Sequence, residues 1–301
     1  MNENLQQSRT ALVLGGGGST GNAWLIGVFA GLFEAGLDVS GADLIVGTSA
    51  GSTAAAQITG AQADELLAVS LTPIEQRQAP TRTEGGGGGG PRGQVVDHLD
   101  RMMNIIAAAS DAADLRRRLC AAALELDAES DGSWTDRWRT IVAPRLPGQG
   151  WPQQAIAITA VNARTGEGVV FDRDAGVDLV DAVAASTSSG LPYWIGDTPY
   201  LDGGFRTNAE NADLAAGYDR VLVLSPFGGR SLVPEEWGTH LATQVAELRA
   251  GGSRVETIIP EPESEHLFGP NGMDLSLRPA AARAGHEQGR ALAGQLSGFW
   301  R

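Results

Sequence analysis

The sequence predicts an α/β protein built on a mainly parallel β-sheet with helices packed on it. Apolar runs that end in glycines occur at 11–18 and 42–47, and a helical pattern follows each of them. Because strand, helix, strand and helix alternate over a short stretch, the two strands are expected to be parallel neighbours. Further strand-like runs at 155–163 and 219–227 extend the same sheet.

Apolar spacing and one glycine predict the first helix and the elements that follow it. Residues 22–37 place large apolar side chains near helical spacing, and Gly36 is suited to end that helix. Residues 42–47 form a second buried strand, and residues 50–60 form a helix of small side chains.

The middle of the chain combines a low-complexity stretch with a helical pattern. Residues 72–92 include six consecutive glycines, so a flexible loop is expected there, of the kind that can cover an active site. Residues 93–144 are helical in pattern and predict a helical insertion. Cys120 is the only cysteine, which excludes an intramolecular disulfide and favours an inert buried thiol.

The C-terminal half returns to alternating strands and helices. The predicted elements are a hairpin of strands 155–163 and 168–172, a helix at 178–186, strands at 198–204 and 219–227, a helix at 234–251, a strand at 254–261 and a last helix at 279–297. Neither an internal repeat nor a linker divides this pattern. A single domain over residues 1–301 is therefore predicted.

Charge and hydropathy restrict the partners. The formal net charge is −14, and all basic side chains apart from histidine are arginine, so nucleic-acid binding is excluded as a function class. Any transient contact with a membrane surface should be local and apolar, because charge would not attract this chain to anionic lipid. No stretch approaches the ~18 apolar residues of a membrane helix, and the N-terminus lacks a leader pattern, so a cytoplasmic location is expected. The sequence carries no indication of oligomeric state.

Residues 47–51, Gly-Thr-Ser-Ala-Gly, match the G-x-S-x-G nucleophile elbow between a predicted strand and a predicted helix. Such a turn exposes the hydroxyl of Ser49, and Gly47 and Gly51 leave room for neighbouring elements. The motif makes Ser49 a candidate nucleophile.

A glycine-rich loop at 15–21 follows the first strand and contains G-x-G-x-x-G at 16–21. A dinucleotide site would need an acidic residue at the end of the second strand, but that strand ends in Gly47 and runs into the elbow. Loops after adjacent parallel strands lie together, so the free amides of this loop are suited to form an oxyanion hole beside Ser49.

Two groups could activate the serine. His266 lies in a loop after a strand and would complete a Ser–Asp–His triad in the chain order of α/β-hydrolases. Asp202 stands at the end of a short strand, followed by Gly203 and Gly204, and a carboxylate within reach of Ser49 could accept its proton directly. The residues alone leave both alternatives open.

The three motifs together, with the stretches at 26–39 and 184–195, resemble the patatin-like phospholipase family over most of the chain, least across 72–150. The resemblance implies a three-layer α/β/α fold and a serine–aspartate dyad, with Ser49 as nucleophile and Asp202 as general base. It implies an oxyanion hole formed by the amides of Gly16, Gly17 and Gly18, aided by that of Ala50.

The resemblance also implies the substrate class, which is lipid or another acyl ester, with no metal and no cofactor. The glycines that would support the motifs are Gly21, Gly47, Gly51, Gly203 and Gly204. The family usually carries a basic residue or glycine where this chain has Thr20, so a basic side-chain role in oxyanion binding is not expected. A non-catalytic lipid-binding module of the same fold is the alternative from another functional class.

Overall fold

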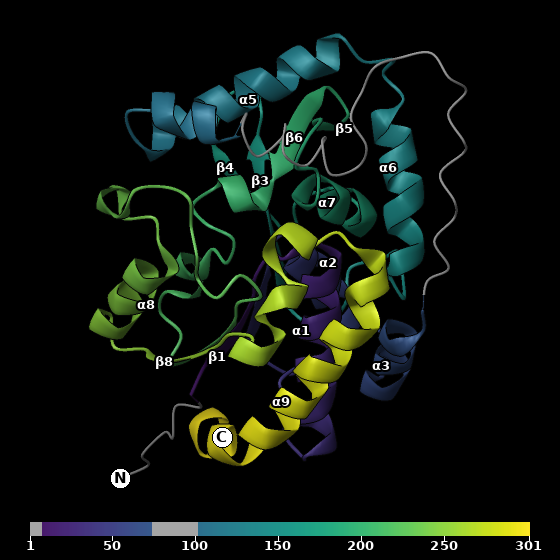
Figure 1. The fold of residues 1–301 in the computed structure, drawn as a ribbon, viewed down its shortest axis with the longest axis vertical. Coiled ribbons are helices and arrows are strands. Elements are labelled where there is room, and N and C mark those ends of the chain that lie inside the picture. Colours follow the sequence, from purple (N-terminus) through teal and green to yellow (C-terminus); the bar gives the residue numbers. More distant parts are fainter. Residues whose placement is uncertain (1–7, 74–101) are drawn as a thin grey trace.

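The computed structural model describes residues 8–73 and 102–301 and has the predicted α/β architecture (Figure 1). The strands are β1 (Thr10–Leu14), β2 (Leu44–Gly47), β3 (Ile156–Asn162), β4 (Gly168–Phe171), β5 (Tyr193–Ile195), β6 (Thr198–Asp202), β7 (Arg220–Leu224) and β8 (Arg254–Ile258). The helices are α1 (Gly18–Glu34), α2 (Ala50–Ile58), α3 (Ala63–Leu71), α5 (Ala112–Ala128), α6 (Trp134–Val142), α7 (Leu179–Ser186), α8 (Leu241–Ala250) and α9 (Arg278–Trp300). Residues 102–108 are also helical.

Two predicted segments lie wholly or partly beyond this description. The glycine-rich loop near 72–92 falls outside the described residues from 74 onward. The first part of the predicted helical insertion, 93–101, falls outside them as well. The described part of the insertion is helical over 102–108, in α5 and in α6, as predicted.

The sheet places the predicted motifs at one edge. Its strand order is β5-β6-β3-β2-β1-β7-β8, and β4 pairs with β3. The five strands from β3 to β8 in this order are parallel, whereas β4, β5 and β6 pair antiparallel at one side. Leu14 at the end of β1 lies opposite Gly47 at the end of β2. Asp202 at the end of β6 lies opposite Ala160 of β3, so all three motifs meet at this edge.

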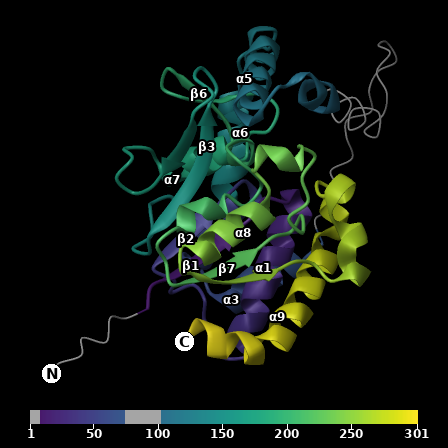
Figure 2. The ribbon, with the colours of Figure 1, turned by 90° about the vertical axis from the view of Figure 1, so that its left-hand side faces the viewer.

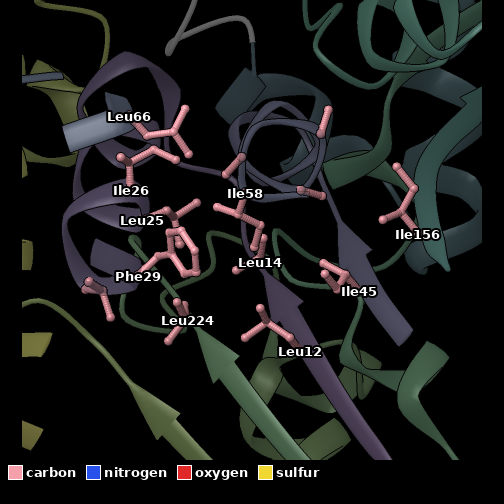
Figure 3. Close-up of a cluster of buried hydrophobic side chains, with 14 of the residues drawn as sticks. Leu12, Leu14, Leu25, Ile26, Phe29, Ile45, Ile58, Leu66, Ile156 and Leu224 are labelled. Carbon is pink, nitrogen blue, oxygen red and sulfur yellow. The ribbon is translucent and has the colours of Figure 1, made fainter. Parts of the chain in front are cut away.

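The strands alternate their side chains between two helical layers. Leu12 and Leu14 of β1 and Ile45 of β2 lie in one buried cluster with α1 and α2 (Figure 3). Val13 and Val46 point to the opposite face, where they share a second cluster with α8. This period of two buries both faces of the sheet and gives a three-layer arrangement, with α8 on the left of the strands and α1 and α9 on the right in Figure 1.

Helices α1 and α9 lie side by side and run parallel (Figures 1 and 2). Their backbones touch at glycines: a Cβ on Gly31 would lie 2.2 Å from the carbonyl oxygen of His286. Gly27 meets the backbone of α9 one turn earlier, and Gly285 and Gly289 meet the backbone of α1 in the same way. A side chain at any of these four positions would force the two helices apart.

The structure differs from the sequence predictions at 234–251, at α3 and at β5, a strand that the sequence did not predict. The single helix predicted for 234–251 is wrong, because Gly238 adopts a left-handed φ of 69° and separates a 3₁₀-helix, Glu235–Trp237, from α8. Helix α3 was not among the predicted elements, although its apolar residues pack on the main core. Cys120 is buried, as predicted, and burial raises the pKa of its thiol to about 11.

Candidate active site

Ser49 occupies a strained turn between β2 and α2. Its φ of 53° and ψ of −118° lie in a region that L residues rarely adopt, at a cost of about 1–3 kcal/mol. The turn is held by its neighbours: the Ser49 amide donates to Ser186 Oγ of α7 at 2.9 Å, and the Ser49 carbonyl accepts from the hydroxyl of Ser52 at 2.6 Å. The side chain of Ser49 is thereby presented at the edge of the sheet.

The two glycines of the elbow are required by close backbone contacts. A Cβ on Gly51 would lie 1.9 Å from the carbonyl oxygen of Leu14, and one on Gly47 would lie 2.7 Å from the Cα of Ser52. The elbow therefore packs directly on the end of β1. Gly21 is also tightly placed, since a Cβ there would lie 3.1 Å from Pro226.

The glycine-rich loop lies beside the serine, as its position in the sheet predicts. A Cβ on Gly16 would lie 3.4 Å from the Cβ of Ser49. The Gly16 amide donates to the carbonyl of Ala209 at 2.8 Å and is thus engaged. Within the described residues, the amides of Gly17, Gly18 and Ala50 donate to no acceptor.

Asp202 lies beside Ser49 and is almost completely buried, with 7% of its surface exposed. Its Oδ1 accepts from the Gly204 amide at 2.8 Å, and the Ser49 hydroxyl lies near enough to the carboxylate to lower its pKa. Burial raises the pKa of Asp202 to about 6, and the Gly204 amide and the nearby Ser49 hydroxyl limit the rise. Gly203 is required next to it, because a Cβ there would lie 2.1 Å from Thr159 Oγ1.

The histidine of the alternative triad lies elsewhere. His266 is exposed in a 3₁₀-helix, Pro262–Leu267, where its Nδ1 lies 3.0 Å from the carbonyl of Glu263. Over residues 8–73 and 102–301, no hydrogen bond joins a histidine ring to Ser49 or Asp202. In the same ranges, no group of three or more His, Cys, Asp or Glu side chains is arranged to hold a metal ion.

Comparison with known families decides the relationship. The model of the patatin-like phospholipase family matches residues 12–215. The chain belongs to this family. Membership supports a lipid acyl hydrolase activity. The matched region ends before α8 and α9.

Among solved structures, the chain is similar to VipD from Legionella pneumophila, with 13% identity and a TM-score of 0.43 over 96% of this chain and 67% of that one. It is also similar to the type III effector protein ExoU, with 14% identity and a TM-score of 0.36 over 96% of this chain. The chain spans about half of ExoU, 53%. A search of curated proteins found no match.

Several buried polar residues of this patatin-like site were not found from the sequence. Ser186 contacts the Ser49 amide, and Asn211 contacts the residues beside Ser49 and Asp202. Glu210 is 2% exposed, accepts from the Ser225 hydroxyl at 2.6 Å, and has a pKa raised by burial. The available signal was the polar run 206–211, which follows a strand and precedes a stretch that is largely apolar.

Proposed function

We propose that the chain hydrolyses acyl esters of lipids through a dyad of Ser49 and Asp202. The proximity of the Ser49 hydroxyl to the buried Asp202 carboxylate carries this proposal. Family membership supports the reaction class, and the strained elbow supports Ser49 as the nucleophile.

Asp202 is suited to act as the base. A carboxylate of ordinary pKa near 4 would bind the serine proton weakly, whereas one with a pKa of about 6 binds it better and is still ionised at neutral pH. Its burial also keeps water from competing for the serine hydroxyl. No histidine is needed in this arrangement, and the position of His266 favours the dyad over the triad.

The reaction runs in two steps that share one oxyanion site. Ser49 Oγ bonds to the ester carbonyl carbon, Asp202 receives the serine proton, and the proton passes to the departing alcohol as its C–O bond breaks. Water then attacks the acyl-enzyme with the same aspartate as base, which releases the fatty acid and restores Ser49.

The oxyanion is held by backbone amides. We assign this role to Gly17, Gly18 and Ala50, whose N–H groups have no acceptor among the described residues. Gly16, expected to donate as well, has its amide engaged by Ala209. Its contribution is space, because its Cα stands against Ser49 without a side chain between them.

We propose that an apolar side chain next to Gly18 of the glycine-rich loop contacts the lipid surface. Met273 is 71% exposed, and its sulfur would lie 3.0 Å from a Cβ on Gly18. Met273→Ser should reduce sedimentation with phosphatidylcholine vesicles, whereas Val69→Ser, which alters a similarly exposed residue on α3, should not. Equal sedimentation of both variants would refute this contact. As far as the chain is described, no helix is long and apolar enough to cross a membrane.

The decisive experiment is hydrolysis of p-nitrophenyl acyl esters and of a phospholipid panel. Ser49→Ala should lower kcat by ~10⁴-fold or more, and Asp202→Asn by ~10³-fold or more, with folding retained. His266→Ala should retain the wild-type rate. A fluorophosphonate probe should label wild-type protein but not Ser49→Ala. Retained hydrolysis in Ser49→Ala, or an unlabelled wild-type protein, would refute the proposal.

A further inference from the structure

Three completely buried polar side chains lie between the elbow and the Asp-Gly-Gly turn. Thr48 precedes Ser49, Thr159 lies on β3, and Asn211 precedes a 3₁₀-helix, Ala212–Ala215. Each has an exposed fraction of 0%. Burying polar groups is unfavourable unless they are fully hydrogen-bonded, so their presence in this position requires a reason.

These side chains are joined to one another and to both catalytic segments. The Asn211 amide nitrogen donates to Thr48 Oγ1 at 3.0 Å and to the carbonyl of Gly203 at 2.9 Å. Thr159 Oγ1 donates to Thr48 Oγ1 at 2.9 Å. The Thr48 hydroxyl in turn donates to the carbonyl of Glu210 at 3.3 Å. A single connected network thus links the residue before Ser49 to the residue after Asp202.

The orientation of the Asn211 amide is fixed from its other end. Its Oδ1 accepts from the Thr207 hydroxyl at 2.7 Å and from the Arg206 guanidinium at 3.1 Å, which directs its nitrogen toward Thr48 and Gly203. Its backbone is left-handed, with φ 55° and ψ 43°, a conformation that asparagine tolerates better than most residues. Asn208 holds this turn by accepting from the amides of Glu210 and Asn211.

The same turn also reaches the glycine loop. The carbonyl of Ala209 accepts the Gly16 amide at 2.8 Å, directly beside Ser49. Residues 208–211 therefore contact all three catalytic segments: the glycine loop through Ala209, the elbow through Glu210 and Asn211, and the segment after Asp202 through Asn211. No covalent connection shorter than about 150 residues joins Ser49 to Asp202, so their separation depends on such contacts.

We infer that Thr48, Thr159 and Asn211 are positioning residues that set the distance between the Ser49 hydroxyl and the Asp202 carboxylate. This inference rests on the proposed dyad. It assigns no contact with substrate to the network. Its effect should appear in kcat and in the reactivity of Ser49, with KM little changed, because proton transfer depends steeply on geometry.

A matched pair at Thr159 tests the inference. Thr159→Ser and Thr159→Ala both remove the methyl group, and only the serine variant keeps the hydroxyl. Thr159→Ala should lower kcat by ~10-fold to ~10²-fold with KM within about twofold, and should slow fluorophosphonate labelling in parallel. Thr159→Ser should restore most of both rates. A structural role alone would lower the melting temperature of both variants without separating their kcat values.

Asn211→Asp is the second variant, because aspartate keeps the shape and the tolerance for a left-handed backbone while it removes both N–H donors. It should lower kcat at least as far as Thr159→Ala. The double variant should lose less than the product of the single losses, since both act on one network. Equal kcat values for Thr159→Ser and Thr159→Ala, together with wild-type kcat in Asn211→Asp, would overturn the inference. Retained hydrolysis in Ser49→Ala would instead overturn the dyad itself.

Discussion

The active-site edge of the sheet and the interface of α1 with α9 both depend on close backbone approach, but for opposite purposes. At the interface, Gly31 and Gly289 let two regular helices touch, and neither glycine has a positive φ. At the edge of the sheet, Ser49 has a left-handed backbone and Asp202 is an ionisable group almost without exposure. The interface adds stability, whereas the candidate active site contains backbone strain and a buried charge that reduce stability.

The difference teaches that a glycine must be interpreted by its surroundings. Gly18 has a φ of 65° and an amide without an acceptor in the described part of the chain, so its backbone conformation matters. Gly31 sits in the middle of a helix, where glycine is normally unfavourable by about 1 kcal/mol relative to alanine. The benefit of a glycine at position 31 arises only from the close approach of the neighbouring helix, α9.

The largest effect is expected at the helix interface. Gly31→Ala should lower the free energy of unfolding by about 3 kcal/mol, because its Cβ would lie 2.2 Å from a backbone oxygen of α9. Gly294→Ala, in the same helix pair but with open space around it, should raise that free energy by about 0.5–1 kcal/mol. Urea unfolding measures both. If the two substitutions change stability alike, the interface does not depend on glycine.

A smaller loss of stability with a selective loss of activity is expected in the glycine loop. Gly18→Ala should lower kcat by ~10²-fold, because a Cβ would lie 2.7 Å from the Gly272 carbonyl and displace the amide assigned to the oxyanion. Its cost in stability should be about 1–2 kcal/mol. Gly36 also has a positive φ, 85°, and a Cβ added there would meet no atom within 4 Å. Gly36→Ala should therefore show similar backbone strain with wild-type kcat. Unimpaired hydrolysis in Gly18→Ala would remove this loop from the mechanism.

The third effect concerns pH. Folding raises the pKa of Asp202 from 3.8 to about 6. At a pH between these two values, folding is therefore accompanied by uptake of a proton, and the stability of the folded state falls as the pH rises through this range. Asp202→Asn should therefore be more stable than wild type at pH 7.5, by about 3 kcal/mol, and the gain should shrink toward pH 4. Wild-type kcat/KM should rise with pH around 6 as Asp202 ionises. A gain in stability independent of pH would show that burial of charge is not its cause.

Local patterns predicted the parts of the molecule that are contiguous in sequence. The elbow around Ser49, most strands and most helices follow from periodicity and glycine placement, and the pairing of Ser49 with Asp202 was implied by the resemblance. The network of Thr48, Thr159 and Asn211 was not predictable, because each residue is ordinary in its own segment and meets the others only in the folded sheet. The role of Gly31 was hidden for the same reason.

The parallel packing of α1 and α9 also has an electrostatic consequence. Arg278, the first residue of α9, donates to the Ser19 carbonyl in the first turn of α1, so both helices begin at the same place. Each helix dipole is equivalent to about half a positive charge at that end. The glycine contacts thus hold the positive N-terminal ends of both helices close together, next to the amides of Gly17 and Gly18. In a chain of net charge −14, this creates a local field that favours a developing negative charge.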